Sequence, residues 1–187
     1  CSSDLVTFAL ITLGGLTAVV APGHVLAMAG RNGVAETGLL GGALLAGSVL
    51  LTARGIAVPG VLADSAVAYT ATAWLVWPAM LIVLAPFALR SRAPRLVTYW
   101  REWITLTVTA TIAAAGAVLV MPSIASVAPP GALRNVVIAA VGLAGGIAVA
   151  SSQLRLYEVD GRRTHLVVAS GWATLGATSV LWLGAPE

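Results

Sequence analysis

Six long apolar runs dominate the chain, and short segments rich in arginine, proline and glycine separate them. Each run is close to the roughly 20 residues that an α-helix needs to cross the hydrocarbon core of a bilayer. Helices are expected because lipid offers no hydrogen-bond partner to open backbone groups, and the continuous blocks do not alternate as barrel strands do. The pattern predicts an all-α integral membrane helix bundle of about six transmembrane helices, at residues 5–29, 37–58, 67–89, 103–121, 135–152 and 165–183.

The composition leaves no room for a soluble domain. Of the 187 residues, 59% are hydrophobic and 9% are charged, and the mean hydropathy is +0.97. A water-exposed surface needs many more charged side chains. We therefore expect residues 1–187 to form one transmembrane domain. Residues 1–5, which begin with Cys1 rather than methionine, are expected to be a non-native start, and a lipid-anchored cysteine is the alternative.

The arginines predict the orientation of the helices. All ten basic residues are arginine, and alternate connections between the runs hold eight and one of them. The arginine-rich side is expected to be cytoplasmic, which places the N-terminus and Glu187 outside a bacterial inner membrane. Both ends outside would also fit a seventh helix missing beyond the C-terminus. The cytoplasmic loop arginines are Arg90, Arg92, Arg95, Arg101, Arg155, Arg162 and Arg163.

The net charge of +3 does not indicate nucleic acid as a partner. A nucleic-acid surface needs a basic stripe with interleaved aromatic residues, and none lies outside the arginine-rich loops. Tyr99, Trp100 and Trp103 flank the third of these loops, and Trp182 lies near the end of the sixth run. Aromatic residues at such places are typical of the membrane–water interface.

Arg54 is the only charged residue inside an apolar run. Its long side chain can reach the outer headgroups or pair with Asp64, just beyond the next turn. It can also bind an anionic ligand that enters from outside. Arg54 and Asp64 are therefore the candidate ligand-binding residues, for a small molecule that the sequence does not identify.

No pattern in the sequence indicates catalysis, a metal or a cofactor. His24 and His165 have no histidine or carboxylate three or four residues away on the same helix, so neither zinc nor haem is expected. Coupled transport and intramembrane aspartyl proteolysis both need carboxylates within the membrane. Here the acidic residues all fall at helix ends or in loops: Asp4, Glu36, Asp64, Glu102, Glu158, Asp160 and Glu187.

Small residues recur at four-residue spacing on two helices: Gly38, Gly42 and Ala46 on the second, and Gly142 and Gly146 on the fifth. This spacing lets helix backbones approach closely. The pattern indicates tight packing inside one bundle, with a homodimer face as the alternative.

Two segments resemble a known family. Residues 54–62, from Arg54 to Leu62, are similar to the signature His-Ala-Leu-Ala-Thr-Pro-Gly-Val-Leu, and 154–157, from Leu154 to Tyr157, to Leu-Arg-Leu-Tyr-Arg-Arg. Both belong to the seven-helix membrane input domains that precede class III adenylate/guanylate cyclases and related bacterial signalling outputs. Arg54 replaces the family's histidine and Val58 its threonine, so a ligand or metal bound by that histidine would be lost or changed here.

The resemblance implies a multi-pass membrane sensor or anchor upstream of a cytosolic nucleotide cyclase or a similar output domain. The enzyme would lie beyond Glu187, and a homodimer is implied because class III cyclase sites form between two catalytic domains. The alternative is a small membrane transporter, permease or channel subunit, which broken helices and an inverted repeat would favour.

Overall fold

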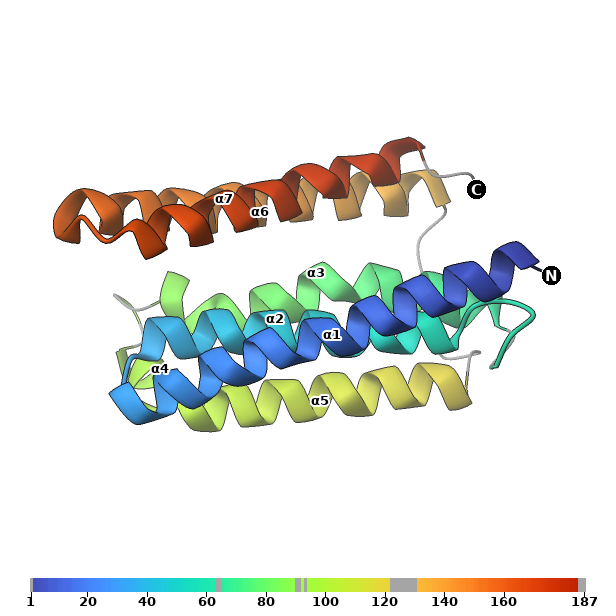
Figure 1. Ribbon diagram of the computed structural model, residues 1–187, viewed down its shortest axis with the longest axis horizontal. Coiled ribbons are helices and arrows are strands. Elements are labelled where there is room, and N and C mark those ends of the chain that lie inside the picture. Colours follow the sequence, from blue (N-terminus) through green and yellow to red (C-terminus); the bar gives the residue numbers. More distant parts are fainter. Residues whose placement is uncertain (1, 63–64, 90–91, 93, 122–130, 185–187) are drawn as a thin grey trace. The chain divides into compact units, whose positions relative to one another are not determined.

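A computed structural model of the chain describes residues 2–62, 65–89, 92, 94–121 and 131–184 (Figure 1). The chain is all-α, and it divides into two compact units, Cys1–Val127 and Ala128–Glu187. The helices of the first unit are α1 (Ser2–Asn32), α2 (Ala35–Ile56), α3 (Ala66–Ala88), α4 (Pro94–Thr98) and α5 (Trp100–Val120). The second unit contains α6 (Gly131–Asp160), α7 (Arg163–Thr178) and the 3₁₀ helix η2 (Ser179–Gly184).

Five of these helices are long and apolar enough to cross a membrane, among the residues that the structure describes. They correspond to the first five predicted runs, and they identify the chain as a helical membrane protein. The sixth run differs, because α7 has only 16 residues before the chain tightens into the 6 residues of η2. By its length α7 alone falls short of a span.

Several helix boundaries differ from those expected. α1 continues through Pro22 and the predicted linker to Asn32. The short helix α4 occupies part of the third connection, and α5 begins at Trp100, three residues before the predicted start. α6 extends from its apolar part, 135–152, to Asp160. The apolar pattern ends where the helix leaves the hydrocarbon. The helix itself continues, because its residues also favour helical structure in water.

α2 lies at the centre of the first unit, where it contacts α1, α3 and α5. Figure 1 shows α4 at the same end of this unit as the α1–α2 connection. Small buried residues on α2 make room for its neighbours: a Cβ on Gly38 would collide with the Trp100 ring of α5, and one on Gly47 with Met80 of α3. The tight approach that the glycine spacing predicts therefore takes place within the unit.

α1 packs along its length on α2, through a narrow strip of its surface. Gly15, Pro22 and Ala29, spaced seven residues apart, are the buried positions of its described part. A Cβ on Gly15 would come within 2.6 Å of the Thr52 hydroxyl oxygen of α2. Most of the remaining surface of α1 is apolar and exposed, as lipid-facing surface would be.

Two prolines inside helices leave carbonyl groups that neighbouring helices satisfy. Pro86 has no N–H to donate to the carbonyl of Ile82, four residues earlier, which instead accepts a 3.2 Å hydrogen bond from the Trp103 indole N–H of α5. In the same way, Pro22 frees the carbonyl of Ala18, which lies 2.9 Å from the Ser48 hydroxyl of α2; this hydroxyl shares its one proton between Ala18 and the Leu44 carbonyl of its own helix, at 2.7 Å. Satisfaction by a neighbouring helix is how proline is tolerated in transmembrane helices.

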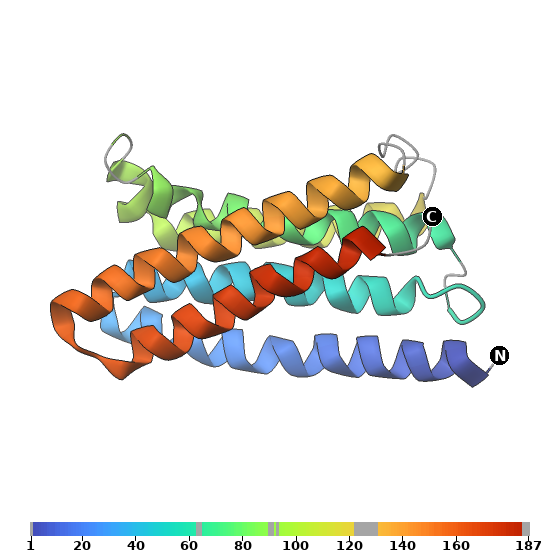
Figure 2. The same cartoon turned by 90° about the horizontal axis from the view of Figure 1, so that it is seen from above.

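The second unit is a helical hairpin, in which α6 and α7 run antiparallel (Figures 1 and 2). A Cβ on Gly146 would lie 2.6 Å from the Gly176 Cα, so the two backbones are in direct contact here. Further along, the Ser179 hydroxyl shares its proton between the Gly176 carbonyl at 2.6 Å and, across the helix pair, the Ala139 carbonyl at 3.1 Å.

We expect Trp103→Phe to destabilise the first unit by about 0.5–1.5 kcal/mol, because it leaves the Ile82 carbonyl without a donor. Pro86→Ala supplies a backbone N–H to that carbonyl, so Trp103→Phe should cost much less in the Pro86→Ala background. Unfolding measurements of the four proteins in one detergent test this coupling. Equal costs of Trp103→Phe in both backgrounds would contradict the proline-linked role of the bond.

Candidate functional site

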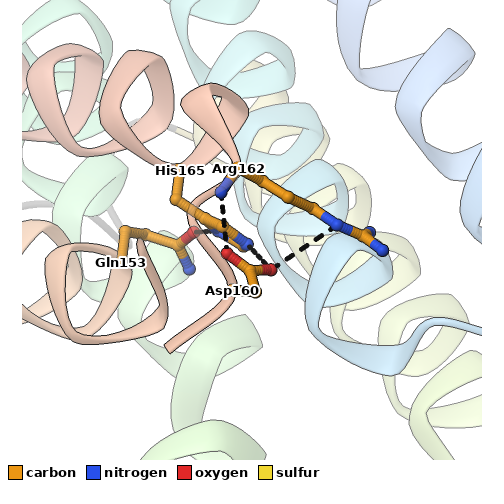
Figure 3. A network of polar contacts seen from close by, with 4 residues as sticks. All are labelled: Gln153, Asp160, Arg162 and His165. Carbon is orange, nitrogen blue, oxygen red and sulfur yellow. Dashed lines mark hydrogen bonds and ion pairs between the residues drawn. The ribbon is translucent and has the colours of Figure 1, made fainter. Parts of the chain in front are cut away.

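A group of polar side chains joins α6 to α7 where the hairpin turns (Figure 3). We call it the turn cluster, and it consists of Gln153, Asp160, Arg162 and His165. Gln153 and Asp160 belong to α6, whereas Arg162 caps α7 and His165 lies in its first turn. The cluster is thus contributed by both helices.

The backbone of the turn brings these residues together. α6 ends at Asp160, and Gly161 adopts a left-handed conformation with φ +68°. Its N–H donates to the Tyr157 carbonyl at 2.8 Å, which closes the last turn of α6. Glycine adopts this conformation without the steric cost of a side chain. The chain can therefore reverse within two residues.

His165 is the centre of the cluster. Its Nδ1 lies 2.8 Å from Gln153 Oε1 and its Nε2 lies 3.0 Å from Asp160 Oδ2. Gln153 is 3% exposed, while the His165 and Asp160 side chains are 22% and 35% exposed. Figure 3 shows the imidazole between the amide and the carboxylate. The histidine therefore connects a buried residue of α6 to its exposed end.

Both ring nitrogens of His165 face hydrogen-bond acceptors. A carboxylate and an amide oxygen both accept hydrogen bonds and donate none. A ring nitrogen that carries a proton donates to the oxygen that it faces, so the imidazole joins Gln153 to Asp160 across the turn.

Asp160 is stabilised as a carboxylate. It lies eight residues beyond Ser152, where the apolar part of α6 ends. The Arg162 backbone N–H, which donates to Oδ1 at 3.0 Å, is the main group that holds the Asp160 pKa below its ordinary value. The His165 hydrogen bond, and the charges of His165 and Arg162, lower this pKa further. The Arg162 Nε lies 3.7 Å from Oδ2.

Chemically, the turn cluster can hold the two helices of the hairpin together, but it offers no catalytic geometry. The cluster contains no nucleophile beside a base. Within the described ranges, no three His, Cys, Asp or Glu side chains gather so as to hold a metal ion. His24 is exposed on α1 in the other unit. We therefore interpret the cluster as a positioning device.

The structure places Arg54 in the last turn of α2, with its guanidinium carbon 4.3 Å from the centre of the Tyr69 ring of α3. This is the distance of a cation–π contact. Asp64, the other candidate ligand-binding residue, lies outside the described residues, as does Arg90. The side chain of Trp182 is likewise not described. Arg54 is thus supported by an aromatic residue that the sequence analysis did not single out.

The loop arginines take several different positions. Arg101 lies in the first turn of α5 and not in a loop, and its Nη2 donates to the Gly30 carbonyl of α1 at 2.7 Å. Its guanidinium also lies 5.3 Å from the centre of the Trp100 ring. Arg101 and the other described arginines of this set are exposed: Arg92, Arg95, Arg155, Arg162 and Arg163. Three of them lie on helices and not in loops: Arg95 on α4, Arg155 on α6 and Arg163 on α7.

The glycine and alanine positions expected to pack all lie on buried helix surface. Gly42 faces Ile104 of α5, where a Cβ would be 2.9 Å from its side chain. Gly142 and Gly146 face Gly176 of α7, and Ala46 is fully buried. Each glycine of these motifs thus has a neighbour within its own chain.

Sequence reasoning missed the turn cluster. It searched for partners of His165 three or four residues away, as a continuous helix would place them. The partners lie five and twelve residues away, because Gly161 reverses the chain between them. A glycine between charged residues is a turn signal that could have suggested a hairpin.

We expect Asp160→Asn to lower the melting temperature by a few degrees at most at neutral pH, because it removes the charge that faces His165 and Arg162. The folded-state pKa of Asp160 is lowered, so its contribution is present above its ordinary value of 3.8 and is lost as the pH falls through the folded-state pKa. The variant and the parent protein should therefore converge once the pH is below the folded-state pKa. Glu158→Gln, which removes a charge from the same helix end, is the control for net charge. A difference that persists in acid, or an equal effect of the control, would contradict this role of Asp160.

Comparison with known proteins adds no relative to this description. No known protein family, no curated protein and no solved structure matches the chain.

Proposed function

We propose that this chain is the multi-pass membrane sensor or anchor of a signalling protein whose output is a cytosolic nucleotide cyclase or a similar domain. The chain would belong with the seven-helix input domains that its two short segments resemble. A seventh helix after Glu187 would connect the bundle to the output domain. A homodimer would form because such an output needs two catalytic domains.

The observation that carries this proposal is the extension of α6 beyond its apolar part. The apolar part, 135–152, spans about 27 Å, and the eight residues that follow add about 12 Å of continuous helix. Arg155, Glu158 and Asp160 on this extension favour water. A rigid helix that leaves the bilayer can carry a displacement out of the membrane, and the turn cluster passes it to α7. Segment 154–157, which resembles a motif of the seven-helix input domains, lies on this extension.

The charge distribution supports a sensor over an ion-coupled transporter. α3 carries no charged residue, and the described charges of the other membrane helices lie in their end turns or on the extension of α6. Coupled transport normally uses an ionisable residue at mid-membrane. The transporter or channel alternative keeps one feature in its favour, which is the three prolines within α1 and α3.

Mechanistically, a ligand or a membrane property would shift the bundle between two packing arrangements. It can do so only by its difference in affinity for the two arrangements. Arg54, stacked on Tyr69, is the candidate contact for an anionic ligand. The described small-residue motifs are used within the chain, so the proposed dimer relies on the output domains and not on these motifs.

The orientation proposed for this function places the arginine-rich connections in the cytoplasm. Single cysteines in a Cys1→Ser background test it. A membrane-impermeant maleimide should label Leu62→Cys on intact cells, and should label Thr98→Cys and Thr164→Cys only after the membrane is opened. The reverse pattern would overturn the orientation.

The signalling output is tested by reading the natural gene beyond the codon for Glu187. We expect one further apolar run of about 20 residues and then a class III cyclase domain. Membranes that contain the full-length protein should then form a cyclic nucleotide. A stop codon directly after Glu187, or a series of additional membrane helices, would reject this output and favour the transporter alternative.

A further inference from the structure

An apolar pocket of about 210 Å³ opens between α3 and α5 of the first unit. Leu50 of α2, which is 1% exposed, forms part of its wall. The α3 residues that line it fall within 75–82 and the α5 residues within 107–114. Both stretches lie near the middle of their helices, so the pocket lies at the depth of the lipid acyl chains.

Small side chains create the space. Ala79 on α3, and Ala110 and Ala114 on α5, line the pocket where larger residues would fill it. Pro78 lies beside Ala79 in the wall. Ala110 and Ala114 are exposed, so the pocket can be entered from outside the helices.

The pocket offers no polar group that seeks a partner. The residues that line it carry no charge, and its two hydroxyl groups are already used. Thr107 donates to the Trp103 carbonyl at 2.8 Å, and Thr111 donates to the Thr107 carbonyl at 2.8 Å. A water molecule needs two to four polar partners, and apolar cavities of about 150 Å³ stay dry and bind small hydrocarbons. The pocket therefore suits hydrocarbon.

We propose that this pocket binds the terminal part of one acyl chain of a membrane phospholipid. The pocket volume of about 210 Å³ exceeds that of the apolar cavities of about 150 Å³ that bind benzene, so several carbons of an acyl chain fit. Acyl chains are the medium at this depth, and the exposed alanines let a chain enter from the bilayer. The bound acyl chain packs against α3 and α5 together. Binding depends on the helices spanning a bilayer and not on the signalling output.

The experiment uses the protein in nanodiscs of phosphatidylcholine that carries a photoreactive diazirine near the end of one acyl chain. After illumination, mass spectrometry locates the cross-links. We expect them to be enriched in residues 75–82 and 107–114 over the exposed apolar positions of α1, such as Leu10, Leu13 and Leu16. Equal labelling of the pocket and of α1 would show ordinary lipid contact and overturn the proposal.

Filling the pocket provides the second arm of the test. Ala114→Leu, and separately Ala110→Leu, should reduce pocket labelling severalfold, to the level of α1, while labelling of α1 is unchanged. Ala113→Leu is the matched control, because this exposed alanine of α5 does not line the pocket. Melting curves identify a filling variant that fails to fold. The labelling of the other filling variant then tests the proposal. Unchanged pocket labelling in a folded filling variant would also overturn the proposal. Because no step uses a cyclase, the outcome is independent of the test of the output.

Discussion

The requirement that backbone carbonyls at membrane depth find donors within the protein governs how the first unit packs. Pro22 and Pro86 each remove one donor from a helix interior, and the Ser48 hydroxyl and the Trp103 indole replace them from neighbouring helices. Each replacement joins two helices at a defined height and rotation. The small residues of α2 then lie opposite Trp100 and Ile104, whose bulk they accommodate. Prolines that would weaken a helix in isolation thus specify the arrangement of the bundle.

The second unit is held by different forces along its length. At its apolar part the backbones meet at Gly146 and Gly176, where close packing favours association. At its charged end the two helices are held by the hydrogen bonds and opposite charges of the turn cluster. Water weakens these interactions only in part, because Gln153 is buried. One hairpin therefore combines a region held by close packing with an end whose contacts depend on the charge of Asp160.

The sequence alone predicted the helical class, because the length and apolarity of the runs are properties of contiguous residues. It could not predict the positions of all helix ends. Residues 153–160 carry charges and were assigned to a connection, although they continue α6. Nor could the sequence pair Trp103 with Ile82. The indole was interpreted as an interfacial residue, and its acceptor is free only because of Pro86 in another helix. The contact between His165 and Gln153 was not predicted either, because contacts across a turn depend on the path of the backbone.

The way α1 is attached has a consequence for assembly. Along its length α1 contacts α2, and near its end it accepts one hydrogen bond from Arg101 of α5. The mutual contacts of α2, α3 and α5 do not require it. During synthesis the first segment can therefore wait in the bilayer as an independent helix, and it can dock after its three neighbours have come together.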